Sequence, residues 1–204
     1  MLKVATVVGS AILPHVPALA RLRLTVFRDW PYLYDGTDAY EAEYLATYAR
    51  CPRAALAIAW NGAEPVGMSS CLPLLDETGN VLAPFRAAGL DPSRWFYFGE
   101  SVLLREHRSA GVGVAFFERR ETHARSLGGY GHAAFCAVQR PDDHPMRPAD
   151  AVPLDGFWRR RGFAPRPGLT CTMRWRDVGH GGETDHLMQF WTKDLAGNAA
   201  KDAT

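Results

Sequence analysis

Residues 106–124 read EHRSAGVGVAFFERRETHA and follow a strongly apolar run. A basic side chain, Arg108, precedes two glycines, Gly111 and Gly113, that stand one residue apart. Apolar residues then recur with helical spacing until two further glycines end the pattern. A helix that begins at such glycines presents free backbone N–H groups, and its dipole favours a phosphate there. The segment predicts either a phosphate-binding helix start or an ordinary turn before a helix.

Two common nucleotide-binding motifs do not match this segment. It lacks the Gly-Lys-Ser/Thr of a Walker-type loop. Phe116 takes the place of the third glycine in the dinucleotide pattern, and no acidic residue ends a second parallel strand about 20 residues later. Both absences count against a nucleotide-binding oxidoreductase.

Strand-like and helix-like segments alternate along the chain. Runs of β-branched, aromatic and other apolar residues predict strands, and Asn61-Gly62 predicts a hairpin turn. The predicted strands cover residues 3–8, 54–60, 65–72, 94–104, 133–138 and 169–175. The predicted helices cover residues 16–27, 38–49, 154–163 and 184–195. A further helix is predicted from Gly111 and Gly113 to residue 127. Proline, glycine and aspartate predict loops over residues 73–94 and 139–150.

The order of these motifs resembles the GNAT superfamily of acetyl-CoA-dependent N-acetyltransferases. The family's coenzyme loop has Gln or Arg, two variable residues, Gly, one variable residue, and Gly or Ala. Arg108, Gly111 and Gly113 match it. The hairpin with Pro65-Val66-Gly67 resembles the family's second and third strands, and residues 157–163 resemble its Phe-Tyr-x-x-x-Gly-Phe. The resemblance spans about residues 1–176. It implies an α/β fold with a mixed, mainly antiparallel central sheet and helices on both faces.

The resemblance also implies a site for acetyl-CoA as co-substrate. The strand ending at residues 102–104 would pair with the pantetheine arm, and the N–H groups that follow would hold the pyrophosphate. This strand and the one at 133–138 would splay apart to admit the thioester. The implied coenzyme-binding residues are Val102, Leu103, Leu104, Arg108, Ser109, Ala110, Gly111, Val112, Gly113 and Val114.

Acetyl transfer to an amine needs a proton acceptor, a polarised carbonyl and a proton for the departing thiolate. Glu100 is the candidate base, since it stands in an apolar strand where desolvation favours proton uptake. A structural carboxylate paired with an arginine is the alternative. The family's acid is often the tyrosine of Phe-Tyr-x-x-x-Gly-Phe, but Trp158 occupies that position here, which leaves the acid role open. Cys136, a thiol on a slot-lining strand, is a weaker candidate for it.

The loop between the first two helices commonly walls the acceptor pocket in this family. Carboxylates and phenols there would suit a cationic amine, while packing on the core is the alternative. His144, beside two aspartates in a proline-rich loop, is a candidate to face the acceptor or relay a proton. The candidate substrate residues are Asp29, Tyr32, Tyr34, Asp35 and His144.

Composition limits the remaining function classes. The chain has 204 residues, 47% of them hydrophobic, and a formal net charge of +1, which argues against a general nucleic-acid binder. Its four cysteines lack paired C-x-x-C spacing, so neither a zinc site nor a disulfide framework is expected. No apolar run is long enough to span a membrane, and the expected location is cytoplasmic. Residues 1–195 are expected to form one domain, and residues 196–204 a disordered tail.

The sequence therefore predicts an N-acetyltransferase that moves an acetyl group from acetyl-CoA to a primary amine by direct attack. The acceptor is a small-molecule or peptide amine, and its identity stays open. Neither a nucleic acid nor a membrane is an expected partner, while a homodimer stays open. The alternative is an acyl-CoA-binding module with little or no catalytic activity.

Overall fold

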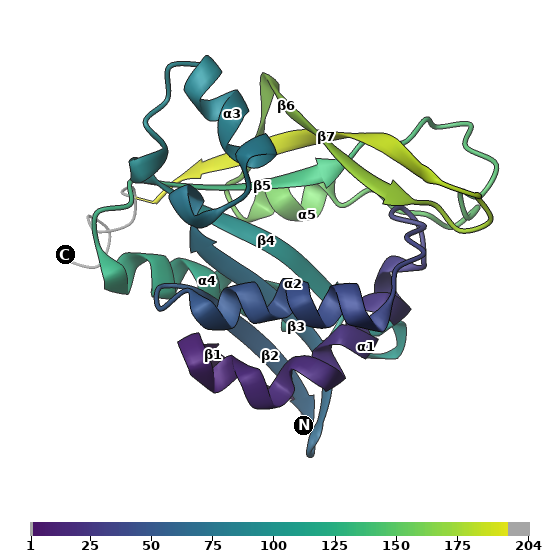
Figure 1. Ribbon diagram of the computed structural model, residues 1–204, viewed down its shortest axis with the longest axis horizontal. Coiled ribbons are helices and arrows are strands. Elements are labelled where there is room, and N and C mark those ends of the chain that lie inside the picture. Colours follow the sequence, from purple (N-terminus) through teal and green to yellow (C-terminus); the bar gives the residue numbers. More distant parts are fainter. Residues whose placement is uncertain (1, 196–204) are drawn as a thin grey trace.

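The computed structural model describes residues 2–195 as one open seven-stranded sheet with helices on both faces (Figure 1). The strand order is β1-β2-β3-β4-β5-β7-β6, and every pairing is antiparallel except that of β4 with β5. The strands are β1 (Lys3–Val8), β2 (Ala55–Asn61), β3 (Glu64–Pro73), β4 (Trp95–Leu103), β5 (His132–Val138), β6 (Ala164–Arg176) and β7 (Glu183–Asp194). The predicted fold class is confirmed. The tail predicted over residues 196–204 lies outside the described residues.

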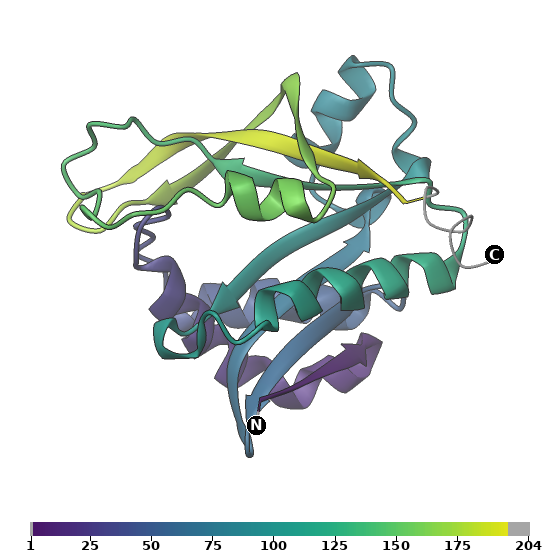
Figure 2. The same ribbon diagram turned by 180° about the vertical axis from the view of Figure 1, so that it is seen from behind.

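Helices cover the two faces unequally. The helices α1 (Val16–Phe27) and α2 (Asp38–Arg50) cross one face of the sheet, and α4 (Val112–Leu127) crosses the other (Figures 1 and 2). The short α5 (Asp155–Arg160) lies on the α4 side. Two layers of apolar side chains result, one under α1 and α2 and one under α4 and α5. No helix within residues 2–195 has the length and apolar character needed to cross a membrane.

Two of the local predictions were wrong. The segment predicted as a helix, residues 184–195, lies in β7 up to Asp194, with His186, Met188 and Phe190 buried and Leu187 exposed. This alternation fits a strand, and β7 bonds on both sides, to β5 and to β6. The predicted loop over residues 73–94 contains a helix, α3 (Gly79–Ala87), which buries three apolar side chains on the α1 and α2 face.

The strands β4 and β5 stay together for only a short distance. Their parallel pairing runs from Trp95↔His132 to Tyr97↔Ala134. Beyond that point β4 continues to pair with β3 and β5 with β7, and the two strands diverge (Figure 2). The centre of the sheet therefore has an open backbone edge on β4 from Phe98 onward.

Candidate active site

The open edge of β4 presents backbone groups that face no neighbouring strand within residues 2–195. The N–H of Leu104, the residue after β4, donates to the carbonyl of Val66 in β3, at 3.0 Å. Because strand backbone groups alternate in direction, the N–H of Leu103 faces the open edge. The end of β4 thus offers hydrogen bonds to an extended ligand.

The start of α4 stands next along the chain, as the glycine motif predicted. Gly111 is the N-cap with φ of 79°, a left-handed conformation that glycine adopts without strain, and no side chain of residues 2–195 caps the helix. The first helical bonds run from the N–H groups of Val114 and Ala115 to the carbonyl of Gly111, at 3.0 and 3.1 Å. The N–H groups of Val112 and Gly113 therefore have no acceptor within residues 2–195, which suits an anion. The exposed Arg108 adds a positive charge there, and its Nε lies 3.4 Å from the carbonyl oxygen of Leu103.

Gly113, the second glycine of the motif, also has a packing role. A Cβ at Gly113 would stand 3.1 Å from Cζ of Phe157 on α5, so glycine lets α5 approach α4. Trp158 packs between Phe135 and Trp191, with ring centroids 5.1 and 4.9 Å away, on the α4 face of the sheet. Its position in this aromatic cluster explains why an indole is tolerated where the family often has a tyrosine.

A β-bulge in β4 sets the position of Glu100. The register places both Gly99 and Glu100 opposite the single residue Ser70, whose hydroxyl oxygen accepts the Glu100 N–H at 3.1 Å. A Cβ at Gly99 would stand 2.6 Å from the Tyr48 hydroxyl oxygen and 2.5 Å from that of Ser70. Glycine at position 99 therefore lets α2 approach the bulge closely.

Glu100 belongs to a buried ion network with Arg23 of α1 and Glu41 of α2. Arg23 Nη1 lies 2.5 Å from Glu100 Oε2, and Arg23 Nε bonds Glu41 Oε2. The three side chains are 7%, 8% and 0% exposed, in the order Arg23, Glu100, Glu41. Burial opposes the charge on Arg23, but its acidic neighbours, Glu100 first, outweigh burial and raise the pKa of the guanidinium. The pairing with an arginine, which the sequence left open for Glu100, is thus present.

Two tyrosines on α2 extend this network. The hydroxyl of Tyr44 donates to Glu100 Oε2 at 3.0 Å, and the hydroxyls of Tyr44 and Tyr48 are 2.9 Å apart. Glu100 Oε1 is buried and has no hydrogen-bond partner within residues 2–195. A buried carboxylate oxygen without a partner is unfavourable.

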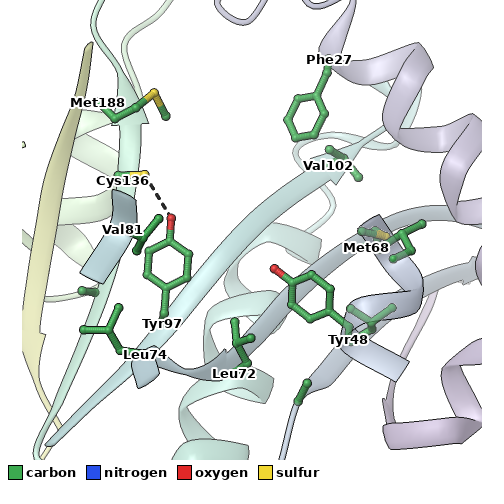
Figure 3. Packing of buried hydrophobic residues seen from close by; sticks show 14 of the residues in the cluster. Phe27, Tyr48, Met68, Leu72, Leu74, Val81, Tyr97, Val102, Cys136 and Met188 are labelled. Atoms are coloured by element: carbon green, nitrogen blue, oxygen red, sulfur yellow. Dashed lines mark hydrogen bonds between the residues drawn. The ribbon is translucent and has the colours of Figure 1, made fainter. Parts of the chain in front are cut away.

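The residues at the β4–β5 divergence include a phenol and a thiol. Tyr97, the last β4 residue paired with β5, has its hydroxyl oxygen 3.1 Å from Cys136 Sγ, and Tyr48 projects over the same face of β4 (Figure 3). Burial raises the pKa of Tyr97. The Cys171 thiol and burial together raise the pKa of Cys136, which makes this thiol a weak acid. All four cysteines are free, and no cluster within residues 2–195 could hold a metal ion.

Of the five candidate substrate residues, Tyr32 is the one whose pKa responds to both Glu100 and Cys136. Burial raises its pKa, and the charges of Cys136 and Glu100 raise it further. Its ring packs on Phe27 and Trp175, with centroids 4.7 and 6.0 Å away. The loop that carries Tyr32 thus reaches the same face of the sheet as Glu100.

Within residues 2–195, none of the other four candidates bonds Glu100. Tyr34 covers Gly36 and is close to Glu41, and burial raises the pKa of its hydroxyl. Asp35 binds Arg28 and Arg176 at 2.7 and 2.9 Å, and the hydrogen bond from Arg28 is the main cause of its lowered pKa. Asp29 is exposed, and His144 lies against the Trp30 ring.

A buried arginine from the 139–150 loop holds the Tyr32 loop in place. Arg140 binds both oxygens of Asp177, at 2.9 and 2.8 Å. It also donates to the carbonyl oxygens of Pro31 and Tyr32, at 2.9 and 2.7 Å. Four hydrogen bonds from one guanidinium thus join three segments that are far apart in sequence.

Glu77 is a titratable residue that the sequence did not single out, because it stands in the segment predicted to be a plain loop. It follows β3 and precedes α3, it is partly buried, and its Oε2 accepts the Thr78 N–H at 3.1 Å. Burial raises the pKa of its carboxyl to about 7. Only the position of a lone glutamate between two apolar segments could have drawn attention to it.

Comparison with known proteins identifies the fold. No protein-family model matches the sequence, and no curated protein matches it. An acetyltransferase of the GNAT family from Streptococcus pneumoniae superposes with a TM-score of 0.58 at 10% identity, over 95% of this chain and 99% of that chain. The yncA protein of Salmonella typhimurium, solved with its cofactor acetyl-CoA, has a TM-score of 0.59 at 13% identity, over 100% and 99%. The ribosomal-protein-alanine N-acetyltransferase of Brucella melitensis has a TM-score of 0.60 at 14% identity, over 95% and 99%. The chain has the fold of GNAT acetyltransferases.

Proposed function

We propose that this chain is a GNAT-type N-acetyltransferase that transfers an acetyl group from acetyl-CoA to a primary amine. One observation carries the proposal: the open edge of β4 is followed, after the short connection of residues 104–110, by the uncapped start of α4. An extended pantetheine arm has amide groups that can add to a strand edge. Its length then brings the coenzyme phosphates to the N–H groups of Val112 and Gly113, next to Arg108.

In this proposal the thioester lies between the diverging strands. The N–H of Leu103 polarises the acetyl carbonyl and stabilises the oxyanion that forms when the amine attacks. The acceptor reaches it from the α1 and α2 face, where Tyr32 and the carboxylates suit a cationic amine. Glu100 already binds Arg23 and Tyr44, so its role is to position Tyr44 and to offer Oε1 to the acceptor.

Titration calorimetry with acetyl-CoA, CoA, NAD and ATP tests the binding step. We expect acetyl-CoA and CoA to bind, and Arg108→Ala to weaken both about tenfold, because a charge-assisted contact to phosphate is lost. Arg119→Ala, an exposed arginine further along α4, is the matched control and should leave binding unchanged. Binding of NAD without CoA would overturn the proposal.

Release of CoA thiol across a panel of amines tests the chemical step. The panel contains spermidine, tyramine, kanamycin and a peptide with an N-terminal alanine. Thiol release that depends on one amine supports the transferase. Tight CoA binding without release from any amine would favour the second candidate, an acyl-CoA-binding module, for which Trp158 in place of the family's usual acid is the supporting observation.

A further inference from the structure

The segment that leads into α5 is fixed to the β4–α4 connection and to the start of α4. Arg105, two residues after β4, places its Nη2 3.3 Å from Oδ2 of Asp150 at one end of the segment. At the other end Phe157 packs so closely on α4 that a Cβ at Gly113 would stand 3.1 Å from Cζ of its ring. Residues 150–157 therefore run beside the start of α4, on the same side of the molecule (Figure 2).

This segment carries two exposed aliphatic side chains that neither the core nor the proposed reaction uses. Val152 is 82% exposed and Leu154 is 54% exposed, and Val152 is the most exposed large hydrophobic side chain within residues 2–195. Neither belongs to a hydrophobic cluster of these residues. The backbone at Leu154 is nevertheless fixed, because its carbonyl accepts the N–H of Trp158 at 3.0 Å where α5 begins. Apolar side chains exposed beside a binding site gain stability when a ligand covers them.

The part of the coenzyme that can reach this segment is its adenosine end. In the proposed function the phosphates lie at the start of α4, and the pantetheine arm leaves them along β4 into the sheet. The ribose and the adenine then leave the phosphates in the other direction, toward the surface where Val152 and Leu154 are exposed.

The charges of the segment favour the neutral base over a phosphate. Asp150 and Asp155 are both exposed on it, and their carboxylates would repel a phosphate placed beside them. Adenine is uncharged, its flat faces pack well on aliphatic side chains, and its amino group can donate a hydrogen bond to a carboxylate. The segment thus combines the apolar surface and the acceptors that an adenine needs.

We propose that Val152 and Leu154 form an adenine subsite, in which the base of the coenzyme packs flat against the two side chains. The inference rests on the proposed function, because it needs the coenzyme phosphates at the N–H groups of Val112 and Gly113. The subsite makes the protein distinguish CoA from 4′-phosphopantetheine, which has the same arm but no adenosine.

Titration calorimetry with three ligands tests the subsite in wild type and in the double variant Val152→Ser, Leu154→Ser. The ligands are CoA, 4′-phosphopantetheine, and dephospho-CoA, which keeps the adenine but lacks the 3′-phosphate. We expect the double variant to bind CoA and dephospho-CoA about tenfold more weakly, because the base loses its apolar contact. Its affinity for 4′-phosphopantetheine should equal that of wild type. Leu13→Ser, at a side chain 52% exposed near the start of α1, is the matched control and should change no affinity.

Amide hydrogen exchange gives a second measurement that needs no variant. CoA should slow exchange over residues 151–156, and 4′-phosphopantetheine should leave it unchanged. Unchanged CoA affinity in the double variant, or an equal loss for CoA and 4′-phosphopantetheine, overturns the subsite alone. A loss for CoA without a loss for dephospho-CoA places the 3′-phosphate there and also overturns it. A wild type that binds none of the three ligands overturns the proposed function, and the subsite with it.

Discussion

Replacing Arg23 by methionine is expected to destabilise the fold strongly and in a pH-dependent way. Methionine keeps most of the side-chain volume but leaves Glu41 and Glu100 without their counter-ion. Both carboxylates are buried, at 0% and 8% exposure, so water cannot replace the guanidinium. Removing one partner of a buried ion pair costs about 3–5 kcal/mol. The free energy of unfolding at pH 8 should therefore fall by at least about 3 kcal/mol.

The sign of the pH dependence follows from proton binding. In the variant, a buried carboxylate without a counter-ion takes up a proton more readily in the folded chain than in the unfolded chain. The folded state then binds more protons, so stability rises as pH falls, by at most about 1.4 kcal/mol per pH unit for each carboxylate involved. The deficit relative to wild type should be clearly smaller at pH 5 than at pH 8.

Urea unfolding of wild type and variant at both pH values measures the effect. Arg28→Met is the matched control, because Arg28 pairs with Asp35 but is 59% exposed, and such pairs contribute about 0–1 kcal/mol. A second variant that also carries Glu41→Gln and Glu100→Gln should recover much of the loss. The reasoning fails if Arg23→Met is no more destabilising than Arg28→Met, or if its deficit is equal at pH 5 and pH 8.

Three further predictions concern the helix start and the Tyr32 loop. Gly111→Ala should destabilise the fold by roughly 1–2 kcal/mol, because alanine is strained at φ of 79°. The same variant should bind acetyl-CoA more weakly in calorimetry, and an unchanged affinity would contradict the role of Gly111 in binding. Gly113→Ala should lower Tm by crowding Phe157, and adding Phe157→Leu should restore it; no rescue would exclude this cause. Arg140→Lys should speed amide hydrogen exchange at Tyr34, because lysine cannot make the four guanidinium bonds; unchanged exchange would show that the loop is held otherwise.

The sequence predicted those parts of the fold in which short-range residue types decide the backbone. Asn61-Gly62 marked the β2–β3 hairpin, where Gly62 has φ of 62°. Gly111 marked the start of α4 and Gly128 its end for the same reason, since both adopt positive φ. These positions constrain the chain locally, so no knowledge of distant residues was needed.

The segment at β7 could not be assigned in the same way. Its apolar residues fit helical spacing and alternation about equally well, as short apolar segments often do. The strand conformation is stabilised by backbone pairing with β5 and β6 on both sides. That pairing depends on the order of strands in the sheet, which the segment itself does not encode.

In the candidate site, too, local sequence signals marked some residues and tertiary contacts brought in others. The sequence alone identified Glu100 and the glycine motif, because a charge in an apolar strand and glycines before a helix are local signals. Only the tertiary structure brought Arg23 and Glu41 to Glu100, since these residues come from two helices. Whether a buried carboxylate holds a structural ion pair depends on its neighbours within a few ångströms, and the packing of α1 and α2 against β4 decides those neighbours.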